Sequence, residues 1–137
     1  MKRILVIEDD TKIAAALGIR LEAAGYQVTT APNGLEGIKQ ILEDRPDLIV
    51  MDIWMPVGLG FSVAQRLQGL GLSGIPIVFI TASKLEGLSE IAKDLGAVAF
   101  FEKPYDPEQL LEVISRALQA KVFPRAEQAR PVAASAC

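Results

Sequence analysis

Short strand-like segments, most of them apolar, alternate with helix-like segments five times along this chain, and this alternation most constrains its fold. The predicted strands cover residues 4–7, 26–30, 47–52, 76–81 and 98–101. A strand buried on both faces is continuously apolar, so segments such as Ile4–Ile7 favour the interior of a parallel sheet. Strand–helix alternation with right-handed crossovers places helices on both faces of such a sheet. The sequence therefore predicts an α/β fold with a doubly wound, five-stranded parallel sheet of (βα)5 topology.

Local signals set the helix boundaries and faces. Gly25 and Gly96 are expected helix stops, and Ser83-x-x-Glu86 is a capping-box pattern. Asp106 before Pro107 is typical of a helix start. The residues predicted to face the core from the first two helices are Ile13, Leu17, Leu21, Ala24, Leu35, Ile38 and Leu42. Past residue 121 the pattern stops, which predicts one domain over residues 1–121 and a disordered tail over 122–137.

Composition excludes several classes of chemistry. The chain has no histidine, which removes histidine-based catalysis, histidine-ligated metals and a phosphohistidine of its own. Cys137 is the only cysteine, so a CxxC redox motif is absent. The formal net charge is −3, which argues against a nucleic-acid or anionic-membrane surface. Any chemistry must therefore use carboxylates, hydroxyls, lysines, backbone groups and a hard metal.

Targeting signals are not recognisable in the sequence. The basic start is followed by only four apolar residues, Ile4–Ile7, before Glu8. A signal peptide needs a longer apolar region, and a membrane span needs about 18 apolar residues. We therefore expect a cytoplasmic protein without a membrane partner.

Polar residues cluster after the predicted strands. The ends of parallel strands are where open α/β sheets bind ligands. The candidates there are Glu8, Asp9, Asp10, Asp52, Thr81, Ser83, Glu102 and Lys103. Crowded carboxylates repel one another, and Mg²⁺ prefers such oxygen ligands together with phosphate oxygens. Asp52 could act as a nucleophile with Lys103 nearby, so the set predicts a magnesium-dependent phosphoryl site.

Four short segments that contain these residues, in this order along the chain, resemble the receiver domain of two-component response regulators. They are Ile4–Asp10, Asp52–Pro56 with Gly60, Thr81–Ala82 and Lys103–Pro104. The resemblance covers roughly residues 2–120 and implies the flavodoxin-like receiver fold. It also implies a phosphorylation-activated signalling switch rather than an enzyme acting on a separate substrate.

The resemblance implies roles for individual residues around the phosphoryl group. Asp52 corresponds to the phosphoacceptor, Thr81 to the hydroxyl that follows the phosphoryl group, and Lys103 to the phosphoryl-binding lysine. Phe100 corresponds to the switch aromatic, and the Lys103–Pro104 bond is expected to be cis.

The resemblance also implies a set of Mg²⁺ ligands and two modulating positions. Glu8, Asp9, Asp52 and the backbone carbonyl of Trp54 correspond to the magnesium ligands; Asp10 is a further candidate, with a helix cap as its alternative role. The side chains of Trp54 and Ser83 are expected to modulate the loss of the phosphoryl group. Glu102 is expected to be an ordinary solvated residue.

The implied partners are a histidine kinase or a histidine phosphotransfer protein as donor, and a downstream protein as target. Val98 and Ala99 stand where the winged-helix branch of the family has acidic residues that pair across a dimer, so we expect a monomer or weak dimer. No DNA-binding output follows, which is consistent with a stand-alone receiver or one cut from a larger chain. Two alternatives remain open: a magnesium-dependent phosphohydrolase with an aspartyl nucleophile, and a flavodoxin-like nucleotide-binding enzyme.

Overall fold

The computed structural model describes residues 1–53, 60–84 and 86–119 of the chain. Strands and helices alternate in it from end to end. Their bounds are β1 Arg3–Ile7, α1 Thr11–Ala23, β2 Gln27–Ala31, α2 Gly34–Glu43, β3 Leu48–Asp52, α3 Gly60–Gly69, β4 Ile77–Thr81, α4 Leu88–Asp94, β5 Ala99–Glu102 and α5 Pro107–Gln119.

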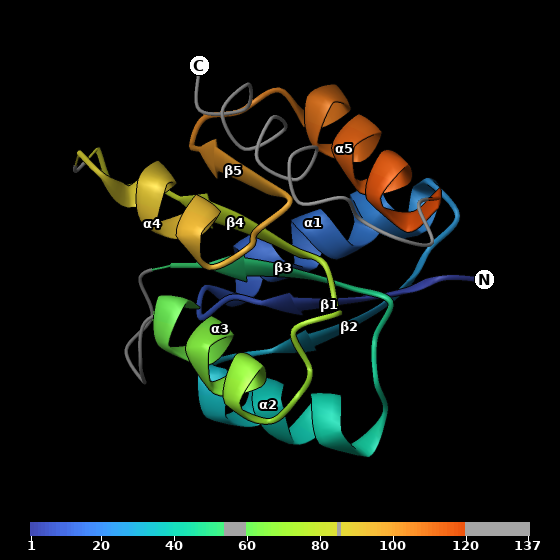
Figure 1. Cartoon of the computed structure of the whole chain (residues 1–137). Coiled ribbons are helices and arrows are strands. Elements are labelled where there is room, and N and C mark those ends of the chain that lie inside the picture. The colour runs from blue at the N-terminus through green and yellow to red at the C-terminus, as the bar shows by residue number, and fades with distance from the viewer. Residues whose placement is uncertain (54–59, 85, 120–137) are drawn as a thin grey trace.

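The strands form one parallel sheet with the order β2-β1-β3-β4-β5. The chain moves outward from β1 to β2, returns to β3 on the other side, and continues to β5. This reversal between β1 and β3 makes the sheet doubly wound, as the sequence predicts. All strand arrowheads point to one edge of the sheet (Figure 1), so residues that follow the strands gather there.

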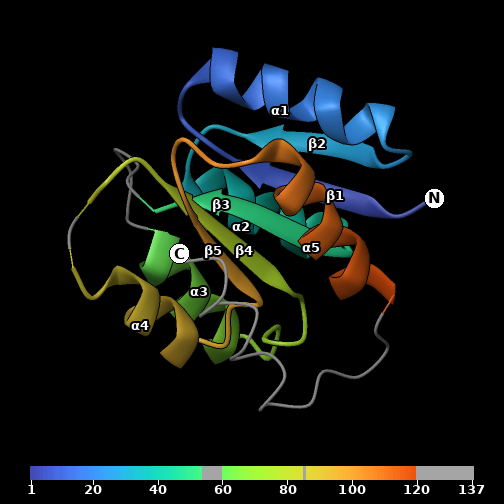
Figure 2. The same ribbon diagram turned by 90° about the horizontal axis from the view of Figure 1, so that it is seen from above.

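Two apolar layers sandwich the sheet. One face of the sheet packs against α2, α3 and α4, with Phe79 and Phe100 among its buried side chains. The other packs against α1 and α5, with Phe101 and Leu110 among its own. Figure 1 shows α2 and α3 below the sheet. Figure 2, which views the molecule from above, shows α5 in front of the strands. The central strands β3 and β4 are buried along their whole length, which explains their continuous apolar sequence.

The predicted inner face of α2 is only partly correct, because Ile38 packs against the core but Leu35 and Leu42 do not. Leu35 and Leu42 are 63% and 62% exposed, whereas Gly37 and Ile41 are buried. A Cβ atom at Gly37 would lie only 2.5 Å from Cδ1 of Ile7, so the absence of a side chain at this glycine lets α2 lie close to Ile7 of β1. The close approach turns the 34–37–41 face inward and leaves both leucines in solvent.

In α1, Leu17 and Leu21 are buried as predicted, and Ala14 is buried beside them. The prediction is wrong for Ile13, which is 37% exposed, and for Ala24, which is exposed at the end of the helix.

The predicted capping box at Ser83 and Glu86 is also wrong. Helix α4 begins only at Leu88, after Gly87 in a left-handed conformation, and no side chain caps it. The Ser83 amide instead donates to Oγ1 of Thr81, so the chain forms a turn directly after β4. None of the described helices is long and apolar enough to cross a bilayer. The tail predicted over residues 122–137 lies outside the described residues.

Candidate functional site

The site lies where the strand order reverses. Glu8 directly follows β1, and Asp52 is the last residue of the neighbouring strand β3. Backbone hydrogen bonds fix both positions, because the Glu8 amide donates to the Ala31 carbonyl and the Ile53 amide to the Ile80 carbonyl. Two acidic side chains from opposite sides of the reversal therefore reach the same place.

Three carboxylates form an acidic group at this edge. Oxygen atoms of Glu8, Asp9 and Asp52 all lie within 4.8 Å of one another. Glu8 and Asp52 are only 2% and 7% exposed, while Asp9 faces solvent. Anions held this closely and partly away from water repel one another, and hard divalent cations bind such oxygen donors. The donor set thus fits a metal ion of the kind the sequence predicts.

Lys103 lies between two of these carboxylates. Its Nζ atom is 3.2 Å from Oε1 of Glu8 and 3.4 Å from Oδ2 of Asp52. The other oxygen of Glu8 accepts a hydrogen bond from the Asp10 amide at 3.1 Å. The Lys103 ammonium therefore contacts two of the three carboxylates, and a group of acidic side chains this close together favours binding of a further cation.

The crowding perturbs two ionisable groups. The pKa of Glu8 is raised from 4.5 to about 7, mainly by burial. The charge of Asp52 and a hydrogen bond with Asp9 also raise it, whereas the hydrogen bond from the Asp10 amide and the charge of Lys103 lower it. Burial lowers the pKa of Lys103, but the charges of Asp52 and Glu8 outweigh it, so the net shift is upward. Lys103 therefore remains a cation at neutral pH.

Thr81 ends β4 next to this group. Its side chain is fully buried, and its Oγ1 accepts the Ser83 amide hydrogen at 3.0 Å. That bond uses only an acceptor lone pair of the hydroxyl oxygen, so the hydroxyl can still donate its own hydrogen to a neighbouring oxygen. The Lys103 amide donates to the Thr81 carbonyl at 2.7 Å, which joins the ends of β4 and β5.

The remaining candidates are placed differently. The Asp10 carboxylate accepts the amides of Lys12 and Ile13 and caps α1, and it is not part of the three-carboxylate group. Trp54 lies outside the described residues. The Lys103–Pro104 peptide bond is cis, as the resemblance implies.

Phe100 is already in the core of this structure. Its side chain is 3% exposed and packs in the α2–α3–α4 layer, opposite Phe79 in the register of β4 and β5. A phenylalanine ring has no hydroxyl that would need a partner, so burial leaves nothing unsatisfied. Val98 and Ala99 are buried in the other layer, so neither is available as a surface contact.

Two residues beside the site differ from what the sequence suggests. Glu102 is not simply solvated, because its Oε2 lies 3.2 Å from Nζ of Lys84. Lys84 also donates to the backbone carbonyl of Lys103 at 3.1 Å. No sequence motif singles out Lys84, since the contact depends on the turn that brings the loop after β4 back to β5.

Comparison with known proteins gives consistent matches. The profile of the response regulator receiver domain matches residues 4–115. The DNA-binding dual master transcriptional regulator RpaA of Synechocystis is 38% identical over 117 residues, 81% of this chain and 46% of RpaA. The alkaline phosphatase synthesis transcriptional regulatory protein PhoP of Bacillus subtilis is 36% identical over 80% of this chain and 45% of PhoP. The chain spans about half the length of these curated relatives.

Solved structures agree with the fold. The chemotaxis response regulator CheY4 of Vibrio cholerae superposes with a TM-score of 0.77 at 30% identity, covering 85% of this chain and 98% of CheY4. The response regulator TrrA of Thermotoga maritima, solved in complex with Mg²⁺–BeF, gives a TM-score of 0.76 at 30% identity, covering 85% of this chain and 99% of TrrA. Both neighbours are matched over nearly their whole length.

Proposed function

This chain belongs to the response regulator receiver domain family, the phosphorylation-activated switches of two-component signalling, and within that family we propose that Asp52 accepts the phosphoryl group. The observation that carries the proposal is the position of Asp52. Its Oδ2 lies 3.4 Å from the Lys103 ammonium, and it shares the acidic group with Glu8 and Asp9. A nucleophilic carboxylate, a fixed cation and a candidate metal site thus meet at the end of the central strand.

Glu8, Asp9 and Asp52 would hold Mg²⁺. Their oxygen atoms match the donor preference of the ion, and their spacing of at most 4.8 Å brings them to a common point. When bound there, Mg²⁺ supplies positive charge next to the phosphoryl oxygens. The Mg²⁺–BeF complex of TrrA, at 30% identity, supports the same choice of ion.

The donor of the phosphoryl group is a phosphohistidine of a partner kinase or phosphotransfer protein. A carboxylate oxygen of Asp52 forms a bond to phosphorus, the bond from phosphorus to the imidazole nitrogen breaks, and that nitrogen keeps the electron pair and takes up a proton. The Lys103 ammonium stabilises charge on the phosphoryl oxygens, and its elevated pKa keeps it protonated. None of the 137 residues is a histidine, so the donor histidine does not lie within this sequence.

Thr81 carries the signal outward. A phosphoryl oxygen on Asp52 accepts the hydrogen of the Thr81 hydroxyl, and the free energy of that contact favours the activated arrangement. Thr81 and Phe100 lie on adjacent strands β4 and β5, so a shift of one strand end reaches the other. The output is a change of the surface around α4, β5 and α5 that a downstream protein binds.

Neither alternative function gains a supporting observation. A nucleotide enzyme of this fold needs amide donors for phosphate after β1, where this chain places Glu8 and Asp9. A phosphohydrolase of the aspartyl type usually carries a second carboxylate two residues after the nucleophile, where the sequence has Trp54. The receiver function therefore accounts for more of the site.

Incubation with a small acyl phosphate tests the function. With Mg²⁺ present, intact-mass analysis should show one added phosphoryl group, and a chelator should prevent the addition. A protein that gains no mass would contradict the switch. Steady turnover of varied phosphate esters would favour the phosphohydrolase.

A further inference from the structure

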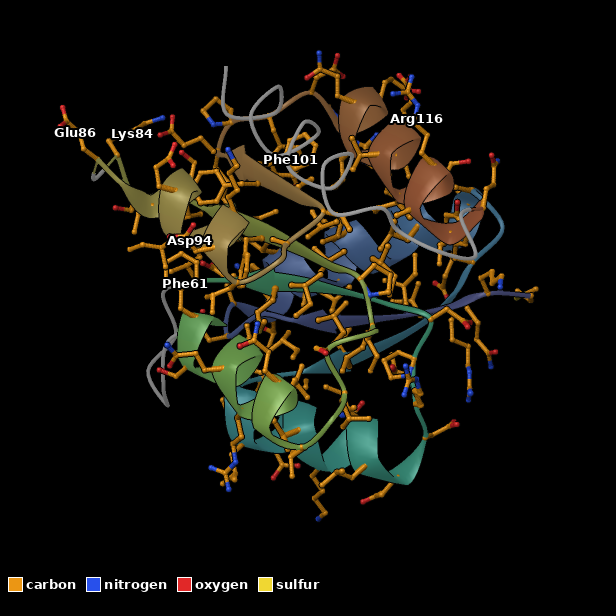
Figure 3. All side chains as sticks on the ribbon, viewed as in Figure 1. Phe61, Lys84, Glu86, Asp94, Phe101 and Arg116 are labelled. Carbon is orange, nitrogen blue, oxygen red and sulfur yellow. The ribbon has the colours of Figure 1, made fainter. Side chains whose placement is uncertain are left out.

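Lys84 connects the loop after β4 to the end of β5. Its Nζ atom lies 3.2 Å from Oε2 of Glu102 and 3.1 Å from the backbone carbonyl oxygen of Lys103. Figure 3 shows the labelled Lys84 side chain on the segment that leads into α4, next to the end of β5. One ammonium group thus contacts two consecutive residues of the neighbouring strand end.

These contacts hold the main chain of Lys103 on both sides. Its amide donates to the Thr81 carbonyl at 2.7 Å, and its carbonyl accepts from Lys84. Glu102, the residue before it, is the register partner of Thr81. Strand β5 ends at Glu102, so the Lys103 carbonyl lies beyond the last strand residue. Thr81 and Lys84, from one short segment, therefore hydrogen-bond to the amide and the carbonyl of Lys103.

The Lys103 ammonium must lie at a defined point. It reaches Oε1 of Glu8 at 3.2 Å and Oδ2 of Asp52 at 3.4 Å. A charge placed in advance stabilises the transferring group without reorganisation, and small displacements of such a group lower rates substantially. A freely moving main chain at Lys103 would lose that placement.

We propose that Lys84 is a positioning residue for phosphoryl transfer to Asp52, because its bond to the Lys103 carbonyl fixes the main chain that presents the Lys103 ammonium. The inference rests on the proposed function, since it concerns the same transfer. The bond to the carbonyl carries the effect. The ion pair with Glu102 contributes little, because its side chains are 67% and 42% exposed and such pairs are weak in water.

Three variants separate positioning from simple charge. Lys84→Gln shortens the side chain and removes the ammonium that donates to the Lys103 carbonyl. Lys84→Arg keeps a long cationic donor. Glu102→Gln removes the ion pair and leaves Lys84 free to bind the carbonyl. Arg116→Gln is the matched control, because Arg116 is also an exposed cation paired with a glutamate, on α5 (Figure 3).

The measurement is the rate constant for phosphorylation by a small acyl phosphate in Mg²⁺, at low and at high ionic strength. We expect Lys84→Gln to be slower than wild type by about fivefold at both ionic strengths. Lys84→Arg should keep at least half of the wild-type rate, and Glu102→Gln and Arg116→Gln should stay within about twofold of it. Melting curves should be similar for all four variants, because all three substituted positions are partly or largely exposed.

Two results would overturn the inference. One is a Lys84→Gln variant that matches Arg116→Gln in rate. The other is a defect that vanishes at high ionic strength, since salt screens a bare charge effect but leaves positioning intact. Failure of the proposed function is distinguishable, because wild type itself would then gain no phosphoryl group on Asp52.

Discussion

A Cβ atom at Gly60 would lie 2.7 Å from the backbone carbonyl oxygen of Asp52. The Gly60 amide also donates to the Ile53 carbonyl at 2.8 Å, so the first turn of α3 lies directly on the end of β3. No larger residue fits there without moving the backbone that carries the proposed phosphoacceptor. The contact explains why a glycine follows Asp52 at this distance in the sequence.

Gly60→Ala should therefore destabilise the protein by about 1–3 kcal/mol, since the added methyl group meets backbone atoms that cannot rotate away. Gly69→Ala is the control on the same helix, because a Cβ atom there has no heavy atom within 4 Å. That change should be neutral or stabilising by up to about 1 kcal/mol. Urea denaturation of both variants measures the difference, and equal stabilities would contradict the packing described.

Without metal, stability should fall as pH rises from 4.5 to about 7, the interval between the ordinary and the folded-state pKa of Glu8. Below this window the carboxyl is protonated in both states. Within it the unfolded chain releases the proton while the folded protein retains it, so unfolding becomes more favourable. No histidine titrates in the same range to obscure the effect.

Denaturation in chelator across that pH range measures the slope. Glu8→Gln should show a much smaller decrease, because an amide does not titrate. A wild-type curve parallel to that of Glu8→Gln would show that the Glu8 carboxyl is not perturbed.

Phosphorylation should change the environments of Thr81 and Phe100. Because Phe100 is already buried, we expect its ring to repack within the core rather than enter from solvent. Phe101 is the matched reference, since it follows directly in sequence but packs in the opposite layer against Tyr105. NMR shifts of the two rings, before and after phosphorylation, test this. Changes at Phe100 no larger than those at Phe101 would refute it.

Trp54 should slow the loss of the phosphoryl group. The position, two residues after Asp52, lies outside the described residues, and the prediction rests on chemistry: an indole only donates and cannot accept a proton from attacking water. Trp54→Asn should lose phosphate about tenfold faster, equivalent to about 1.4 kcal/mol of barrier. Trp54→Phe should remain slow. Decay time courses in Mg²⁺ measure the three lifetimes, and equal lifetimes of wild type and Trp54→Asn would exclude a role for the Trp54 side chain.

Most strand positions were predictable because strands buried inside a parallel sheet are continuously apolar. The mostly exposed strand β2 was predictable instead from its β-branched residues Val28, Thr29 and Thr30. Each observed strand lies within one or two residues of its predicted bounds, and Asp52 and Thr81 end their strands as expected. Glu8, Asp52 and Lys103 lie at or just after strand ends and contact one another there, so their proximity could be predicted without predicting the helices. The site was therefore largely readable from sequence order.

Helix orientation and loop contacts were not predictable in the same way. The inner face of α2 depends on the close approach of Gly37 to Ile7. A glycine has no apolar side chain, so a search for apolar periodicity does not mark it as a buried position. The false capping box at Ser83 arises because the same residue types form turns and helix caps. Lys84 reaches Lys103 only through that turn, a contact between segments that no local pattern encodes.

The most direct test of the central claim is the site of phosphorylation. Asp52→Asn and Asp94→Asn, the latter an exposed aspartate on α4, would be treated with acyl phosphate and Mg²⁺ beside wild type and analysed by intact mass. We predict one added phosphoryl group on wild type and on Asp94→Asn, and none on Asp52→Asn. Full labelling of Asp52→Asn would contradict the account.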